Sequence, residues 1–175
     1  MHDVDRIANL LGAAALGLTD RALDGAAQVR RLSTSSTAAL ISLYATPGLS
    51  VSELGRRVRL SQPAAARMVD SLEADGAVRR APSTVNRRWM TVHLTDQGCA
   101  LAQELLGARR VPLRQAVEKL DPDDQHALAG LLERILYELE EGTGQGQRIC
   151  RLCDREACIR TAACPIGRAE RGEPR

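Results

Sequence analysis

Four cysteines lie close together near the C-terminal end of the sequence, with the spacing C-x2-C-x4-C-x5-C. Thiolates at such short spacing can share one metal ion or cluster, and neighbouring thiols can also oxidise in pairs. Tetrahedral zinc accepts four thiolates, and a C-x2-C turn supplies half of such a site. The pattern therefore predicts a metal or redox site formed by Cys150, Cys153, Cys158 and Cys164.

The spacing leaves the identity of this centre open. It resembles the compact zinc knuckle, although that motif has His as its third ligand. Pro165 directly after the last cysteine also resembles iron–sulfur ligation, whose usual spacing is tighter. We expect zinc, with an iron–sulfur cluster as the alternative and a disordered tail of free thiols as the remaining reading. Nearby arginines would offset thiolate charge and lower the thiol pKa: Arg148, Arg151, Arg155 and Arg160.

Composition and charge limit the classes of protein that this sequence can form. The 175 residues suffice for one domain with an appendage, and the 2% aromatic content leaves the core to aliphatic side chains. The net charge is only +2, but residues 56–88 hold eight Arg against three acids, whereas residues 121–141 hold seven acids against Arg134 alone. A local basic stretch favours a phosphate-facing surface. The alternative is that these arginines only form a solvated surface without a binding role. We see no signal peptide or membrane-spanning run and expect a cytoplasmic protein, in which clustered cysteines favour metal or redox roles over structural disulfides.

Apolar periodicity and capping residues predict a mainly α fold. Residues 4–18 have helical spacing, and the hydroxyl residues 33–36 are candidate caps for a helix at 37–45. Ser50, with Glu53 as its capping-box partner, and Ser61 are positioned to cap two short helices, and Thr95 can cap a long one that ends near residue 120. Residues 78–81 and 89–94 are predicted strands that flank a polar loop. Residues 128–139 form a leucine stripe, either plain core or interface. The GTGQGQ stretch of residues 142–147 favours a flexible linker before the cysteine tail.

Three helices followed by strand, basic loop and strand is the order of a winged helix-turn-helix. The helix after Ser61 would turn its apolar face to the core and its outer face to the major groove, and the loop between the strands would place arginines at a hairpin tip near phosphates or a minor groove. The predicted DNA-binding residues are Ser61, Gln62, Ala64, Ala66, Arg67, Arg79, Arg80, Asn86, Arg87 and Arg88. For Arg79 and Arg80, a solvated strand edge is the open alternative.

The segments LSQPAAARMVDSLEADGAVRR (60–80) and NRRWMTVHLTDQG (86–98) resemble the MarR family of bacterial transcription regulators. The family typically has L-S-x-x-x-x-x-R-x-V-x-x-L-E-x-x-G in its reader helix and D-R-R-x-x-x-V-x-L-T-x-x-G across its wing. The resemblance implies a homodimer built from the first and last helices, binding of double-stranded DNA, repression, and Arg87 as the wing-tip arginine. It also implies a small-molecule effector of unknown identity or release by thiol oxidation. Asn86 stands where the family usually has Asp, and the tail beyond residue 148 is outside the family pattern.

The sequence thus predicts a winged helix-turn-helix with a two-stranded hairpin wing and long terminal dimerisation helices. We expect a dimerisation helix at 1–33, a DNA-binding region at 34–98, dimerisation helices at 99–142, a linker at 143–147 and a Cys-rich tail at 148–175. We interpret the protein as a DNA-binding regulator, not an enzyme. The alternatives are a metal-dependent or redox enzyme, for which no catalytic set is apparent, and an interaction module that recruits a partner through the tail. The operator, the regulated genes and the sign of regulation are not encoded in these patterns.

Overall fold

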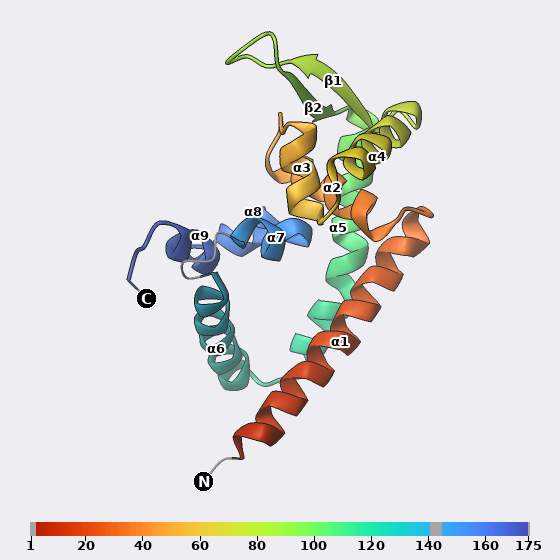
Figure 1. Ribbon diagram of the computed structural model, residues 1–175. Helices are drawn as coiled ribbons and strands as arrows, with labels where there is room; N and C mark the ends of the chain where they lie inside the picture. Colours follow the sequence, from red (N-terminus) through yellow and green to blue (C-terminus); the bar gives the residue numbers. More distant parts are fainter. Residues whose placement is uncertain (1–2, 141–144, 175) are drawn as a thin grey trace.

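The computed structural model describes residues 3–140 and 145–174, which form helices and one two-stranded antiparallel sheet (Figure 1). This architecture confirms the mainly α winged-helix prediction. None of the helices in this part of the chain combines the length and apolar character needed to cross a bilayer. In chain order the elements are α1 (Val4–Val29), α2 (Thr34–Ala45), α3 (Val51–Val58), α4 (Gln62–Ala74), β1 (Val78–Pro82), β2 (Met90–Leu94), α5 (Asp96–Val117), α6 (Pro122–Glu140), α7 (Gly146–Ile149), the 3₁₀ helix η1 (Cys150–Leu152), α8 (Arg155–Ile159) and α9 (Pro165–Glu170).

Side-chain caps begin two helices of the winged region where the sequence predicts them, at Ser50 and Thr95. The predicted cap at Ser61 is wrong, because its side chain forms no capping hydrogen bond at the start of α4. The hydroxyl oxygens of Ser50 and Thr95 accept hydrogen bonds from the backbone N–H groups of Glu53, at 3.1 Å, and Gly98, at 3.0 Å. Ser33 caps α2 in the same way through the N–H of Ser36, so this helix begins at Thr34, three residues earlier than expected. Each bond satisfies a donor that the first turn of a helix leaves without an intrahelical partner.

The wing is a short hairpin tied to the helices at its base. β1 and β2 pair in the register Val78↔Leu94 to Pro82↔Met90. Leu49, just before α3, forms a bridge with Val92, whose N–H donates to the Leu49 carbonyl at 2.8 Å. The wing and the start of α3 are therefore held together by backbone hydrogen bonds as well as by packing.

The hydrophobic core lies where α2, α3, α4, the sheet and the first half of α5 meet. Leu40, Leu54, Val69, Val92 and Leu105 are fully buried there. Because α2 is buried along most of its length, it forms the central element around which the DNA-binding region is assembled.

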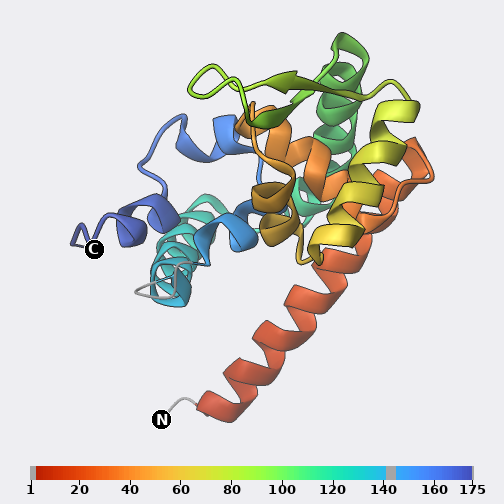
Figure 2. The same ribbon diagram turned by 45° about the horizontal axis from the view of Figure 1, so that its top comes forward.

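The terminal helices leave much apolar surface uncovered. α1 packs along α5 but extends beyond it toward the N-terminus, as both ribbon views show (Figures 1 and 2). On α6, Leu131 is 54% exposed and Leu139 55% exposed, so the reading of the leucine stripe as core of the protomer is wrong. A helical stripe identifies an apolar face but not what covers it, and no element within the described residues covers this one.

The tail folds back onto the winged region instead of hanging free. η1 contacts α2, α7 contacts α3, and α9 packs on α6. Leu152 joins the edge of the main core, and the Ser42 hydroxyl donates to the backbone carbonyl of Arg151 at 3.4 Å. The expectation that the tail is decoupled from the helical core is therefore wrong.

The predicted linker at 143–147 is also shorter than expected. Residues 141–144 lie outside the described part of the chain, and Gly146 and Gln147 are already helical in α7. Gly146 is buried against α9, where an added Cβ would lie 2.5 Å from Ile166 Cγ2. This glycine therefore serves close helix packing, which the composition of the segment does not reveal.

Candidate nucleic-acid interface and cysteine cluster

The two faces of α4 divide as the sequence predicts. Ala65, Met68, Val69 and Leu72 are buried in the core. The outer face is formed by the residues predicted to read DNA: Gln62 and Arg67 are exposed, and Ala64 and Ala66 are half-buried. Ser61 is exposed at the start of α4 and its side chain forms no capping hydrogen bond, so its hydroxyl is accessible. This surface offers amide, guanidinium and methyl groups that can meet base edges in a major groove.

The arginines of β1 have different environments. Arg79 is exposed. Arg80 forms an ion pair with Asp70, Nη2 to Oδ1 at 2.6 Å, and another with Glu73, whose carboxylate also accepts the Arg80 backbone N–H. These contacts raise the pKa of Arg80 and tie β1 to α4. Because both carboxylates already hold its guanidinium, we leave Arg80 out of the proposed DNA-contacting set.

The wing tip presents two exposed arginines, Arg87 and Arg88. Asn86 shapes the turn that carries them: its side-chain oxygen accepts the Arg88 N–H at 3.0 Å, and its carbonyl accepts the Trp89 N–H at 2.9 Å. Trp89 is 64% exposed and lies just outside β2, whereas the sequence analysis placed it in the strand. The hairpin therefore carries positive charge at its far end, where it can reach phosphates.

The four tail cysteines gather around one small cavity of about 30 Å³. Cys150 begins η1 and Cys153 follows it, Cys158 lies in α8, and Cys164 directly precedes α9. Their thiols form a chain of contacts, Cys150 with Cys153, Cys153 with Cys158, and Cys158 with Cys164. The fold thus brings together the cysteines that the sequence assigned to one site, while Cys99 lies apart on α5.

Contacts within the cluster perturb the thiols in opposite directions. The hydrogen bond with Cys153 lowers the pKa of Cys150, whereas the same bond, together with burial, raises the pKa of Cys153. Burial and the neighbouring thiols raise the pKa of Cys158 to about 12. Without a metal ion, Cys150 is thus the thiol most easily deprotonated among the three that shift.

The types of donor atom at the cysteine cluster favour a metal site, whereas their present arrangement does not. Four soft sulfur donors around one cavity match the chemistry of a structural zinc site. However, no group of three or more His, Cys, Asp or Glu in residues 3–140 and 145–174 has the geometry to hold an ion as it stands.

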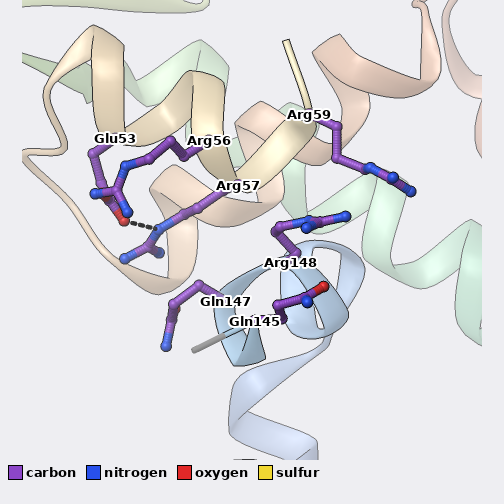
Figure 3. A pocket seen from close by; sticks show the side chains of 7 residues that line it. All are labelled: Glu53, Arg56, Arg57, Arg59, Gln145, Gln147 and Arg148. Atoms are coloured by element: carbon purple, nitrogen blue, oxygen red, sulfur yellow. Dashed lines mark hydrogen bonds and ion pairs between the residues drawn. The ribbon is translucent and has the colours of Figure 1, made fainter. Parts of the chain in front are cut away.

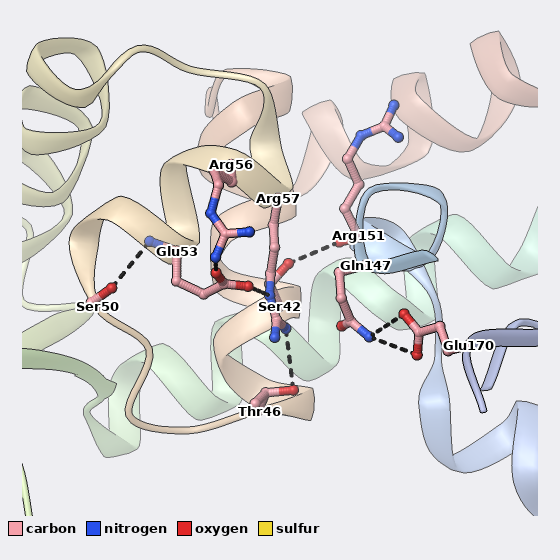
Figure 4. A network of polar contacts seen from close by, with 9 residues as sticks. All are labelled: Ser42, Thr46, Ser50, Glu53, Arg56, Arg57, Gln147, Arg151 and Glu170. Carbon is pink, nitrogen blue, oxygen red and sulfur yellow. Dashed lines mark hydrogen bonds and ion pairs between the residues drawn. The ribbon is translucent and has the colours of Figure 1, made fainter. Parts of the chain in front are cut away.

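Polar contacts link α2 both to α3 and to the tail (Figure 4). Arg57 of α3 makes the first link: Nε pairs with Glu53 Oε1 at 3.1 Å, and Nη1 donates to Thr46 Oγ1 at 3.3 Å. The Arg57 side chain is only 12% exposed and also lines the thiol cavity. The Ser42 hydroxyl makes the second link by donating to the Arg151 carbonyl at 3.4 Å. In α7, Gln147 donates to Glu170 of α9 at 3.2 Å.

Sequence reasoning missed the role of Arg57, which it counted only as one arginine of the basic stretch at residues 56–88. Ser50 and Glu53 were recognised as a cap and its partner, but the Glu53 carboxylate pairs with Arg56 and Arg57. The spacing of Glu53 and Arg57, four residues apart, signals an ion pair on a helix. The tail, which is distant in the sequence, helps to bury that pair, so the residues near Glu53 and Arg57 do not predict its burial.

Comparison with known proteins gives a consistent picture. The model of the MarR family matches residues 32–89. The chain is 28% identical to the HTH-type transcriptional regulator PrsX of Escherichia coli over 53% of its own length and 56% of the relative's. It is 26% identical to the HTH-type transcriptional repressor MdtR of Bacillus subtilis over 62% of its own length and 70% of the relative's.

A solved structure of a MarR family protein from Bacillus stearothermophilus supports the fold. It superposes with a TM-score of 0.70 at 20% identity, over 78% of this chain and 94% of the other. Residues 32–89 of this chain therefore match the MarR family, and the relatives that the chain resembles are HTH-type transcription regulators.

Proposed function

We propose that this protein acts on the chromosome in the cytoplasm as a dimeric repressor, and that it binds a near-palindromic operator with half-sites about one helical turn apart. The observation that carries this proposal is the outer face of α4, with Gln62 and Arg67 exposed beside a wing that ends in Arg87 and Arg88. In this assignment Gln62 and Arg67 contact base edges, while Arg79 and the wing arginines contact the phosphate backbone.

Dimer formation would cover the apolar surface that a single chain leaves exposed. On α1, Ile7 is 52% and Leu16 69% exposed, and α6 adds Leu131 and Leu139 at 54% and 55%. Two symmetric copies would bury these faces against each other, because a two-fold interface uses the same patch on both subunits. We therefore assign the exposed apolar side chains of the helices near residues 4–31 and 95–141 to the dimer interface.

Selection of bound fragments from random and genomic duplexes by the purified full chain tests DNA recognition. We expect enrichment of one inverted repeat. Enrichment of no sequence at physiological salt would contradict a sequence-specific regulator.

The substitution Leu131→Glu places a charge in the proposed interface and should convert the dimer to a monomer in sedimentation at micromolar concentration. The matched change Val85→Glu, at an 88% exposed position in the wing loop, should leave the dimer intact. A monomeric parent protein would contradict the assignment.

We further propose that Cys150, Cys153, Cys158 and Cys164 hold one centre that controls DNA binding, with zinc as the first candidate and an iron–sulfur cluster as the second. Four thiol donors around one cavity support it. When bound, zinc would supply a structural cross-link between η1, α8 and α9. Oxidation of thiol pairs in contact is a second candidate for control, favoured by the chain of thiol–thiol contacts.

Anaerobic purification followed by metal analysis and an absorption spectrum separates these readings. One zinc per chain without visible colour supports the zinc site, and absorption near 400 nm with bound iron supports a cluster. Protein free of both metals, with freely titrating thiols, would contradict a metal centre.

A further inference from the structure

A basic pocket of about 400 Å³ lies between α3 and α7, separate from the outer face of α4 and from the wing. We call it the α3–α7 pocket. In Figure 3, α3 contributes side chains from one side and α7 from the other. The lining residues that matter here are Glu53, Arg56, Arg57, Arg59, Gln147 and Arg148.

Positive charge in this pocket exceeds negative charge. Four arginines line it, and Glu53 is the acidic residue among its described lining. That carboxylate is already shared between Arg56 and Arg57. Within the described residues, neither Arg59 nor Arg148 takes part in an ion pair, so the α3–α7 pocket attracts anions.

Arg148 supplies a second and independent observation. Its Nε is buried and has no hydrogen-bond partner in the described residues. A buried charged donor without an acceptor is unfavourable, and an anion held in the α3–α7 pocket would supply one. Arg57 points the same way, because burial lowers the pKa of its guanidinium and the Glu170 charge only partly opposes that shift.

The chemistry of the lining defines the class of ligand. Guanidinium groups match the two oxygens of a carboxylate or phosphate group, and Gln147 adds an amide donor. Every described side chain of the lining ends in a charged or amide group, so polar contacts would select the ligand. We propose that the α3–α7 pocket binds a small anion with at least two negative charges, as a phosphomonoester or a dicarboxylate carries.

A DNA phosphate is the rival occupant. In both ribbon views α3 lies between the wing and α7 (Figures 1 and 2). None of the residues that line the pocket belongs to the wing or to the outer face of α4. Gln147 and Arg148 also come from the tail and not from the winged region.

Calorimetric titration of the full chain with inorganic phosphate and with succinate, at fixed ionic strength and without DNA, tests the proposal. Saturable binding of at least one of them at one site per chain is expected, with acetate binding at least tenfold more weakly. Arg148→Gln and Arg59→Gln should each weaken binding at least tenfold. The matched variant Arg31→Gln removes one exposed charge from outside the pocket and should bind as the parent does. Circular dichroism and metal content show whether each variant is folded.

Two results would overturn the proposal. If neither phosphate nor succinate binds saturably at millimolar concentration, the pocket is not an anion site. If Arg148→Gln then also weakens binding to random duplex DNA, the occupant is a DNA phosphate instead. Equal loss of binding in Arg31→Gln and Arg148→Gln would reduce the effect to overall charge. Neither result would affect the DNA selection experiment, so the two proposals fail separately.

Discussion

Replacing Arg87 by alanine tests the wing most directly, because the side chain is exposed at the tip and its expected contact is with the backbone or the minor groove. Each phosphate contact contributes about 0.9 to the slope of log affinity against log salt. A dimer carries two wings, so Arg87→Ala should reduce that slope by roughly 1.8 units. Over a fourfold rise in salt, the parent protein should lose affinity about 12-fold more than the variant does.

Fluorescence anisotropy with a labelled duplex, repeated between about 50 and 200 mM salt, measures this difference. The loss should be similar on cognate and random DNA, because backbone contacts carry no sequence information. Arg110→Ala is the matched control, since it removes an exposed arginine from α5, away from the wing. Parallel slopes for parent and Arg87→Ala, or an equal change in Arg110→Ala, would refute the assignment of Arg87 as a phosphate contact.

Three other substitutions probe the reader helix, the thiols and the tail. Arg67→Ala should cost about 1–3 kcal/mol on the operator and relax specificity; an equal loss on random DNA would contradict base reading. Cys158→Ser should abolish metal binding measured by metal analysis, whereas Cys99→Ser should retain it, and metal retained in Cys158→Ser would rule out a four-thiolate centre. Gly146→Ala places a Cβ 2.5 Å from Ile166 Cγ2 and should cost about 1–3 kcal/mol in urea unfolding, while Gly130→Ala, with no heavy atom within 4 Å, should not destabilise; equal effects would refute the packing argument.

Local signals in the sequence predicted the winged region well. Ser50 and Thr95 begin helices because a hydroxyl before a helix satisfies its first N–H groups, whatever the rest of the chain does. The faces of α4 followed from a period that fixes which residues share a side. The boundaries of α2 and β2 were less accurate by one to three residues, since neighbouring serines compete as caps and strand ends depend on pairing.

Long-range packing was not predictable by the same means. The leucine stripe of α6 was correctly helical, but periodicity does not say whether the face is covered by the same chain or by another. The segment GTGQGQ favoured a linker by composition, yet Gly146 is small because α9 packs against it. The cysteines were assigned as one set from spacing alone, and the fold does gather them around one cavity, but their position beside α2 and α3 has no counterpart in the spacing.

The position of α3 gives the tail a physical route to the DNA-binding surface. At its N-terminal end, Leu49 is bridged to Val92 of the wing, and at its other end a turn through Arg59 leads into α4. Between them Arg57 reaches the thiol cavity and the α3–α7 pocket. A change in the thiols or in an anion beside Arg148 would therefore meet Arg57, whose guanidinium bonds Glu53 of α3 and Thr46 at the end of α2. Coupling of this kind needs a differential free energy between two arrangements of α3, and Arg57, which lines both cavities, is the residue at which to look for it.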